Sequence, residues 1–267
     1  MNLHLSDKKV IITGASKGLG LEIVKGFLKE GSIVTMCSRS NDTLEKAKIS
    51  LNVPANQVFT YSLDVTNYHE VSEGIKTAFK NMGSLDILIN NVGSTSKFAS
   101  FFDLEEEDWI DTYRLNVISI INTVRVAHPF LKKSDNPRII NISSLTGLEP
   151  GTFSPHYSVS KAAVINLSKH LSNILAADKI LVNCVVPGPF ESDAWSRNIQ
   201  RVANQRNISY EEAEKIESEL ASSTIPVNRI GIPSDIVPII LLLASEYSSW
   251  TNGACFIIDG GKMRSIY

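Results

Sequence analysis

The sequence is poor in the features that mark secreted, membrane-spanning and nucleic-acid-binding proteins. Its 267 residues include three cysteines, which are too few and too far apart for a disulfide framework or a zinc knuckle. No apolar run approaches the ~20 residues that a membrane-spanning helix needs. The 26 basic and 28 acidic residues leave a formal net charge of −2, so no positive excess points to nucleic acid. The five histidines show no ligand spacing, and no metal site is expected.

The N-terminal region and the cysteines together suggest a compartment. Met1 to Val10 has no apolar core of the length found in signal peptides. Cys37, Cys184 and Cys255 are expected to be small buried residues rather than disulfide partners. A reducing, cytoplasmic location is therefore the prediction.

Short apolar, β-branched runs alternate with longer helical patterns along the chain. Apolar residues make up 43% of the sequence, enough for a sizeable core. The predicted strands are Val10–Thr13, Ile33–Cys37, Val58–Tyr61, Leu85–Asn90, Arg138–Ser143, Leu181–Val186 and Cys255–Ile258. The predicted helices are Leu19–Glu30, Thr43–Leu51, His69–Met82, Leu104–Leu131, Tyr157–Ala177 and Asp235–Ala244. This alternation predicts a doubly wound, Rossmann-type α/β fold with a parallel sheet, in one domain over residues 1–267.

Two capping-box patterns mark further helix starts. Asp103 and Glu106 have this spacing and are expected to begin the fourth helix. Ser209 and Glu212 repeat it inside residues 188–228, a long insertion between the sixth strand and the last helix. Loops of this length in compact domains often serve as lids, so a helical substrate lid is expected. A surface insertion or an oligomer contact is the alternative.

A glycine-rich loop follows the first strand and opens the first helix. Glycines at such a turn let the backbone approach a pyrophosphate, and the helix N-terminus offers free N–H groups. An ordinary glycine-rich turn is the alternative, but the place after the first strand favours dinucleotide binding. The predicted contacts in this loop are Gly14, Ser16, Lys17, Gly18, Leu19 and Gly20.

The end of the second strand indicates which dinucleotide is bound. An acidic residue there would bind the ribose hydroxyls of NAD and repel a 2′-phosphate. The sequence has Arg39 instead, and no acid before Asp42. Arg39 can pair with a phosphate through two hydrogen bonds, and Lys17 adds a second cation. NADP(H) is therefore expected over NAD(H), although either cation alone would usually be a solvated surface charge.

A tyrosine and a lysine four residues apart suggest acid–base chemistry. Tyr157 and Lys161 share one face of a predicted helix. An ammonium close to a phenol favours the phenolate and is expected to lower the pKa of Tyr157. Ser144 ends the fifth strand, at the sheet edge where open α/β folds bind ligands. The spacing of the pair is weak by itself, because any helix produces it by chance.

Ordered motifs then match a known family over almost the whole chain, from Val10 to Gly261. The motifs are TGASKGLG at 13–20, LDV at 63–65, NNVG at 90–93, LNV at 115–117, ISS at 142–144, YSVSK at 157–161, VNCVVPG at 182–188 and IDGG at 258–261. The chain resembles the short-chain dehydrogenase/reductases, and within them the 3-oxoacyl-(acyl carrier protein) reductases. The sequence departs only slightly from the family pattern: Val92 stands where the NNAG motif usually has alanine, and Ser192 where threonine is more common.

The resemblance implies roles for individual residues. Tyr157 would be the general acid/base, Ser144 would orient the carbonyl oxygen, and Lys161 would hold the nicotinamide ribose. Asn116 would bind a water that connects Lys161 to solvent, whereas Asn90 would tie neighbouring strands together. The further cofactor contacts that the resemblance implies are Asp64, Val65, Asn91, Gly93, Pro187, Gly188, Phe190 and Ser192.

The expected activity is NADPH-dependent reduction of a ketone to a secondary alcohol, in a reversible reaction. The substrate stays open between a small ketone and a 3-oxoacyl thioester on a carrier protein. Substrate-wall candidates are Glu149, Phe153, His156, Phe190 and Trp195. A protein that binds NADP(H) without turnover, as a sensor or scaffold, is the alternative from another class. The family also forms dimers and tetramers through its long helices, so a homo-oligomer is expected, with Val164, Leu167, Leu171 and Ile174 as an apolar stripe.

Overall fold

Seven parallel strands form one sheet in the order β3-β2-β1-β4-β5-β6-β7. The computed structural model describes residues 2–95 and 97–265. The strands are β1 (Lys9–Thr13), β2 (Ile33–Ser38), β3 (Val58–Ser62), β4 (Ile87–Asn90), β5 (Arg138–Ile142), β6 (Leu181–Pro187) and β7 (Cys255–Ile258). All seven coincide with predicted strands to within two residues, because buried parallel strands have apolar runs that the sequence displays directly.

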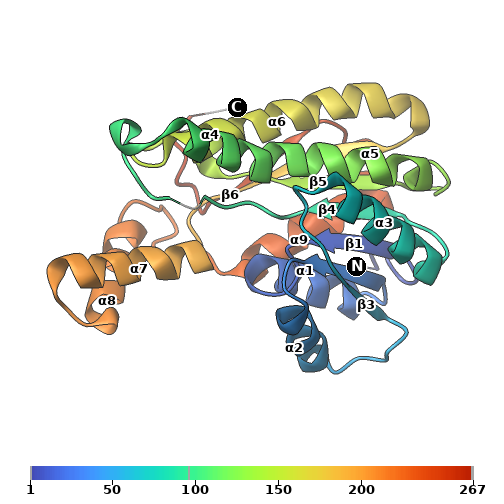
Figure 1. Ribbon diagram of the computed structural model, residues 1–267, viewed down its shortest axis with the longest axis horizontal. Helices are drawn as coiled ribbons and strands as arrows, with labels where there is room; N and C mark the ends of the chain where they lie inside the picture. The colour runs from blue at the N-terminus through green and yellow to red at the C-terminus, as the bar shows by residue number, and fades with distance from the viewer. Residues whose placement is uncertain (1, 96, 266–267) are drawn as a thin grey trace.

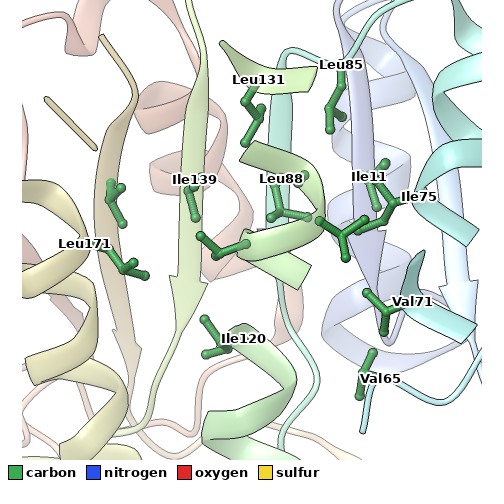
Figure 2. Close-up of a cluster of buried hydrophobic side chains, with 14 of the residues drawn as sticks. Ile11, Val65, Val71, Ile75, Leu85, Leu88, Ile120, Leu131, Ile139 and Leu171 are labelled. Carbon is green, nitrogen blue, oxygen red and sulfur yellow. The ribbon is translucent and has the colours of Figure 1, made fainter. Parts of the chain in front are cut away.

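Helices cover both faces of this sheet (Figure 1). One face packs against α1 (Gly18–Lys29), α2 (Asn41–Leu51) and α9 (Pro233–Ala244). The other face packs against α3 (Tyr68–Met82), α5 (Ser119–Leu131) and α6 (Pro155–Leu175), where Figure 2 shows Ile11, Leu88 and Ile139 of the strands facing helix residues. The chain is therefore a single Rossmann-type α/β domain, as the sequence predicts.

The predicted helix Leu104–Leu131 is two helices with a wider turn between them. The helix α4 (Glu106–Tyr113) runs into a π-helical segment, Arg114–Ile118, and α5 follows. Helical periodicity alone does not reveal one π turn, because the apolar pattern continues through it. Such turns are rare and are frequent at functional sites, and this one contains Asn116.

The start of α4 corrects the predicted capping box. The N-cap residue is Glu105, and its backbone N–H donates to the carboxylate of Asp108 at 2.9 Å. Asp103 instead accepts a hydrogen bond from the hydroxyl of Ser100. The helix thus begins two residues later than predicted, because a 3₁₀ turn, Phe101–Asp103, occupies the predicted start.

The long insertion contains a helical hairpin rather than one helix. Its helices are α7 (Asp193–Arg206) and α8 (Tyr210–Ser222), and the hydroxyl of Ser209 caps α8 as predicted. The hairpin has its own small core, formed by Ile199, Val202, Ala203 and Ala213. Figure 1 shows both helices projecting from the body of the domain beyond the end of the sheet.

The expectation that all three cysteines are buried is wrong for one of them, whereas the apolar stripe on α6 divides between core and surface. Cys37 and Cys184 are buried, but Cys255 is exposed on the edge strand β7. Of the apolar stripe on α6, Val164 and Leu171 face the core, whereas Ile174 is 53% exposed. No helix among the described residues combines the length and the apolar character that crossing a bilayer requires.

Candidate functional site

The candidate site lies where the strand order reverses, between β1 and β4. The chain runs outward from β1 to β2 and β3, then returns to β4 on the other side of β1. The loops that follow β1 and β4 therefore diverge, and open α/β sheets bind ligands in the crevice that this leaves. The glycine-rich loop follows β1 and the Asn90–Gly93 motif follows β4.

In the glycine-rich loop, side chains in place of the glycines would clash with the backbone or cover it. Gly14 adopts a φ of +64°, and a Cβ on Gly20 would collide with the carbonyl oxygen of Gly14. A Cβ on Gly18 would meet nothing within 4 Å, so the backbone there is open. No side chain caps the first N–H groups of α1, and the first turn carries no acid. This loop fits the pyrophosphate of a dinucleotide, which needs free N–H groups and a bare backbone.

The cations expected near the adenosine differ in their surroundings. Arg39 is exposed at the end of β2, and its carbonyl oxygen accepts a hydrogen bond from the Ser62 hydroxyl at 2.8 Å. Lys17 forms an ion pair with Asp193 at the start of α7 instead of standing beside Arg39 as an isolated charge. In this structure the local positive charge at the end of β2 therefore comes mainly from Arg39.

The polar side chains of Asp64, after β3, and Asn91, after β4, form hydrogen bonds with the backbone of nearby loops. The Asp64 carboxylate accepts hydrogen bonds from the Thr66 backbone and hydroxyl, both at 2.8 Å. The Asn91 side-chain amide donates to the carbonyl oxygens of Thr13 and Gly14, so it ties the end of β4 to the glycine-rich loop.

Asn90 ties the strands together, as predicted. Its amide donates to the Asn141 side chain at 2.8 Å, and its Oδ1 accepts from the Thr123 hydroxyl. The neighbouring Val65 is buried, and its carbonyl oxygen accepts a hydrogen bond from Asn122. These contacts hold β4, β5 and α5 in a fixed relation below the crevice.

Tyr157, Ser144 and Lys161 come together at the carboxyl end of β5. The Ser144 hydroxyl lies close enough to the Tyr157 phenol to affect its pKa, and the Lys161 Nζ lies 5.6 Å from the centre of the tyrosine ring. The Lys161 ammonium is buried and donates to the Ile142 carbonyl oxygen at 3.0 Å. Helical spacing on α6 sets Tyr157 and Lys161 on one face, and the sheet supplies Ser144.

The pKa of Tyr157 differs from the sequence expectation. Burial raises it to about 12, and the nearby Ser144 hydroxyl lowers it only in part. Burial also lowers the pKa of Lys161 to about 8. The expected lowering by Lys161 is not found, because the lysine faces the ring and its charge is itself disfavoured by burial.

Asn116 completes this cluster from the π-helical segment. Its Nδ2 donates to the carbonyl oxygens of Ser94 and Thr112, both at 2.8 Å. Its Oδ1 is buried and has no hydrogen-bond partner among residues 2–95 and 97–265. A buried acceptor without a hydrogen-bond partner destabilises the folded protein, so this oxygen is suited to accept from a bound water or ligand.

Gly93 lies against both Lys161 and Asn116, which leads to a first prediction. A Cβ at this position would overlap the Lys161 Nζ and lie 2.9 Å from the Asn116 Oδ1. The lysine end is flexible, so Gly93→Ala is expected to fold and to displace the ammonium. We expect turnover to fall about tenfold or more, because small misplacements of catalytic groups are costly. Steady-state kinetics with a thermal melt measures both effects, and Gly151→Ala, where nothing lies within 4 Å of the added Cβ, is the matched control.

The residues after β6 form the other rim of the site. Pro187 ends β6, and a Cβ on Gly188 would lie 2.5 Å from the Asp259 Cβ, so the chain packs tightly there. Phe190 pairs with Gly231 in an isolated bridge. The Ser192 hydroxyl accepts from the Trp195 backbone N–H and thereby caps α7.

The contacts between the hairpin and the body were not predicted. Arg201 of α7 lies 4.8 Å above the Phe98 ring, which is stacked on Phe153 at 5.1 Å. Arg197 reaches the Ser94 hydroxyl at 3.4 Å. A sequence signal for α7 was present, since Trp195, Ile199, Val202 and Ala203 have helical spacing after the Ser192 cap. Which body residues the helix meets depends on the tertiary structure alone.

Two further features complete the surroundings. His156 is buried, and its Nε2 lies 2.6 Å from the Thr95 hydroxyl. Within the described ranges, no group of three or more His, Cys, Asp or Glu side chains has metal-binding geometry.

Comparisons with known proteins agree with this geometry. Residues 8–202 match the family model described as short chain dehydrogenase. A 3-oxoacyl-[acyl-carrier-protein] reductase, FabG of Thermotoga maritima, is 30% identical over 97% of this chain and 99% of its own length. The NADPH-dependent reductase BacG of Bacillus subtilis is 30% identical over 98% of this chain and 100% of its own.

Solved structures agree as well. The L-sorbose reductase of Gluconobacter frateurii, in complex with NADPH and L-sorbose, superposes with a TM-score of 0.92. It is 27% identical, and the match covers 100% of both chains. A match of this extent in both sequence and structure excludes a chance likeness of motifs. The chain belongs to the short-chain dehydrogenase/reductase family and is an oxidoreductase.

Proposed function

We propose that this protein is an NADPH-dependent carbonyl reductase that converts a ketone to a secondary alcohol. The observation that carries the proposal is the cluster of Ser144, Tyr157, Lys161 and Asn116 beside a glycine-rich loop that fits a dinucleotide. NADPH, when bound, supplies the hydride. The residues of this chain then have to hold the dinucleotide, orient the carbonyl and deliver a proton.

Tyr157 is the proposed proton donor. With a pKa of about 12 its phenol is protonated at neutral pH, which is the state that reduction requires. The nearby Ser144 hydroxyl is suited to bind the same carbonyl oxygen. Lys161 and the orphaned Oδ1 of Asn116 both lie against Gly93, so a water between them would return a proton toward Lys161. Each group thus has a distinct part in a single proton transfer.

NADP(H) is the proposed cofactor in preference to NAD(H). Arg39 is exposed at the position where NAD-binding folds use an acid, and a guanidinium there can bind a 2′-phosphate. The proposed dinucleotide contacts remain those expected from the sequence, from Gly14 to Gly20 and from Asp64 to Ser192. The relatives named as NADPH-dependent or bound to NADPH support this preference.

Two substrate classes are consistent with the site. A small polyhydroxylated ketone is favoured by the structural likeness to an L-sorbose reductase over the full chain. A 3-oxoacyl thioester on a carrier protein is favoured by the relatives that carry that name. The hairpin α7–α8 contacts the loop after β4 through Arg197 and Arg201, so we propose that residues 188–228 act as the substrate lid.

The test is a side-by-side titration of the purified protein with NADPH and NADH, followed by ketone reduction. We expect NADPH to bind at least about tenfold more tightly, since one charge-assisted hydrogen bond contributes about 1.5–3 kcal/mol. Ketohexoses and a 3-oxoacyl thioester are then compared as substrates by following the oxidation of NADPH through the absorbance of its reduced nicotinamide. Binding of neither cofactor would refute the proposal.

A homo-oligomer is also proposed, and it gives a second prediction. The outer sides of α4 and α6 expose apolar side chains, among them Ile110 at 39%, Val159 at 53% and Ile174 at 53%. Apolar side chains gathered on paired helices are typical of subunit interfaces. We expect light scattering to find a dimer or tetramer, and Ile174→Arg to shift it toward monomer. Leu220→Arg, at a 60% exposed position on α8, is the control. A monomeric parent protein would contradict this prediction.

A further inference from the structure

Two of the three cysteines lie opposite each other on neighbouring strands. Cys184 of β6 and Cys255 of β7 are register partners in the parallel pairing. Partners in register project to the same face of a sheet, and neighbouring strands are about 4.8 Å apart. A disulfide needs Cα atoms about 4.4–6.8 Å apart. The backbone therefore already satisfies the distance for a disulfide between them.

The two thiols differ in accessibility. Cys184 is 1% exposed, whereas Cys255 is exposed on the edge strand. The contact between the two thiols lowers the pKa of Cys255, whereas the same contact and burial raise the pKa of Cys184. An accessible thiol with a lowered pKa is the one that reacts with oxidants. A buried thiol in contact with it is placed to complete a disulfide.

The third cysteine has neither property. Cys37 is buried in β2, and burial raises its pKa to about 12. Its thiol is therefore expected to stay reduced and unreactive. This difference supplies an internal control within the same chain.

We propose that Cys184 and Cys255 form a reversible disulfide when the protein meets a hydroperoxide. The Cys255 thiolate sulfur attacks a peroxide oxygen, the O–O bond breaks and hydroxide leaves, which gives a sulfenic acid. The Cys184 sulfur then attacks the Cys255 sulfur, the S–O bond breaks, and the hydroxyl leaves with the Cys184 proton as water. Both thiols are oxidised by two electrons in total, and the peroxide oxygens end as water or hydroxide.

The cysteine pair lies near α6, the helix that carries Tyr157 and Lys161. Cys184 packs in the core beneath α6 with Val164 and Leu171. Lys161 is near, because its Nζ donates to the Ile142 carbonyl oxygen and Cys184 is the register partner of the preceding residue, Asn141. A bond to Cys255 would pull the Cys184 sulfur toward β7 and change the packing beneath α6, the helix that carries Lys161. Oxidation is therefore expected to lower turnover.

The experiment treats the purified full chain with hydrogen peroxide and counts free thiols. We expect the count to fall from three to one, with a mass loss of two hydrogens and no covalent dimer on a non-reducing gel. Peptide mapping should join Cys184 to Cys255, and dithiothreitol should restore all three thiols. Retention of three thiols, a dimer, or a sulfinic acid at Cys255 without a disulfide would overturn the proposal.

Single variants separate the roles of the thiols. Cys255→Ser is expected to slow thiol loss about tenfold or more, because the accessible thiolate is gone. In Cys184→Ala, dimedone should trap a sulfenic acid at Cys255, whereas Cys37→Ala should behave as the parent protein. If Cys184→Ala fails to fold, the peptide map of the parent protein still decides the pairing.

Activity supplies an independent measurement. We expect turnover to fall about twofold or more on oxidation and to recover on reduction, with Cys255→Ser insensitive to peroxide. Unchanged turnover in the oxidised protein would refute the connection to Lys161. The thiol count does not depend on the proposed reductase function, so failure of one is distinguishable from failure of the other.

Discussion

Replacing Tyr157 by phenylalanine is expected to lower the turnover of ketone reduction by about 10²–10⁴-fold, the range of a positioned general acid. The Lys161 ammonium lies 5.6 Å from the centre of the tyrosine ring, and the phenol, with a pKa of about 12, carries its proton at neutral pH. Phenylalanine keeps the ring and its packing on α6. Affinity for NADPH should therefore be nearly unchanged, as measured by fluorescence titration beside the steady-state kinetics.

A matched control separates the missing hydroxyl from a general effect of the substitution. Tyr247→Phe removes a hydroxyl from a ring that is 55% exposed after α9, and it should leave both turnover and binding as they are. Retained turnover in Tyr157→Phe would show that another group donates the proton. Loss of NADPH binding together with turnover would instead assign the phenol a binding role.

Replacing Arg39 by aspartate should reverse the cofactor preference. The change removes a charge-assisted hydrogen bond worth about 1.5–3 kcal/mol and adds repulsion between two anions. Since about 1.4 kcal/mol corresponds to a tenfold change in affinity, the NADPH/NADH ratio of kcat/KM should fall about 10²-fold or more. The hydrogen bond from the Ser62 hydroxyl goes to the backbone carbonyl oxygen of Arg39, which the substitution keeps, so the end of β2 should keep its fold.

The control has the same change of charge at a distance. Arg125→Asp alters an exposed position on α5, on the face of the sheet opposite α1 and α2, and should leave the ratio unchanged. An unchanged ratio in Arg39→Asp would show that the phosphate selects another cation. Lys17 is then the next candidate, and its ion pair with Asp193 would have to open for NADPH.

Local signals determined most of the fold and of the candidate site. The apolar runs of the buried strands located all seven, since a parallel sheet covered on both faces leaves no polar alternation to interrupt them. The glycine-rich loop and the Tyr157–Lys161 spacing are contained in short stretches of sequence. The Ser209 cap was visible for the same reason, because the residues that make it are three apart.

Other features depend on contacts between distant segments. The π turn that holds Asn116 follows an uninterrupted apolar pattern, so periodicity predicted one long helix. The ion pair of Lys17 with Asp193 joins the glycine-rich loop to the hairpin, and no local sequence pattern predicts it. The raised pKa of Tyr157 also depends on distant segments. Burial of the phenol by the surrounding elements raises the pKa more than the neighbouring Lys161, which the sequence shows, can lower it.

The sequence by itself thus determined the fold class, the dinucleotide loop and the residues of the catalytic cluster, because strand hydrophobicity, turn chemistry and helical spacing act over a few residues. The tertiary structure alone decided where the hairpin meets the body, which cation is neutralised and that Cys184 lies opposite Cys255. Those outcomes follow from the register of the sheet and from burial. Both are properties of the assembled layers, to which every element contributes and which no single segment encodes.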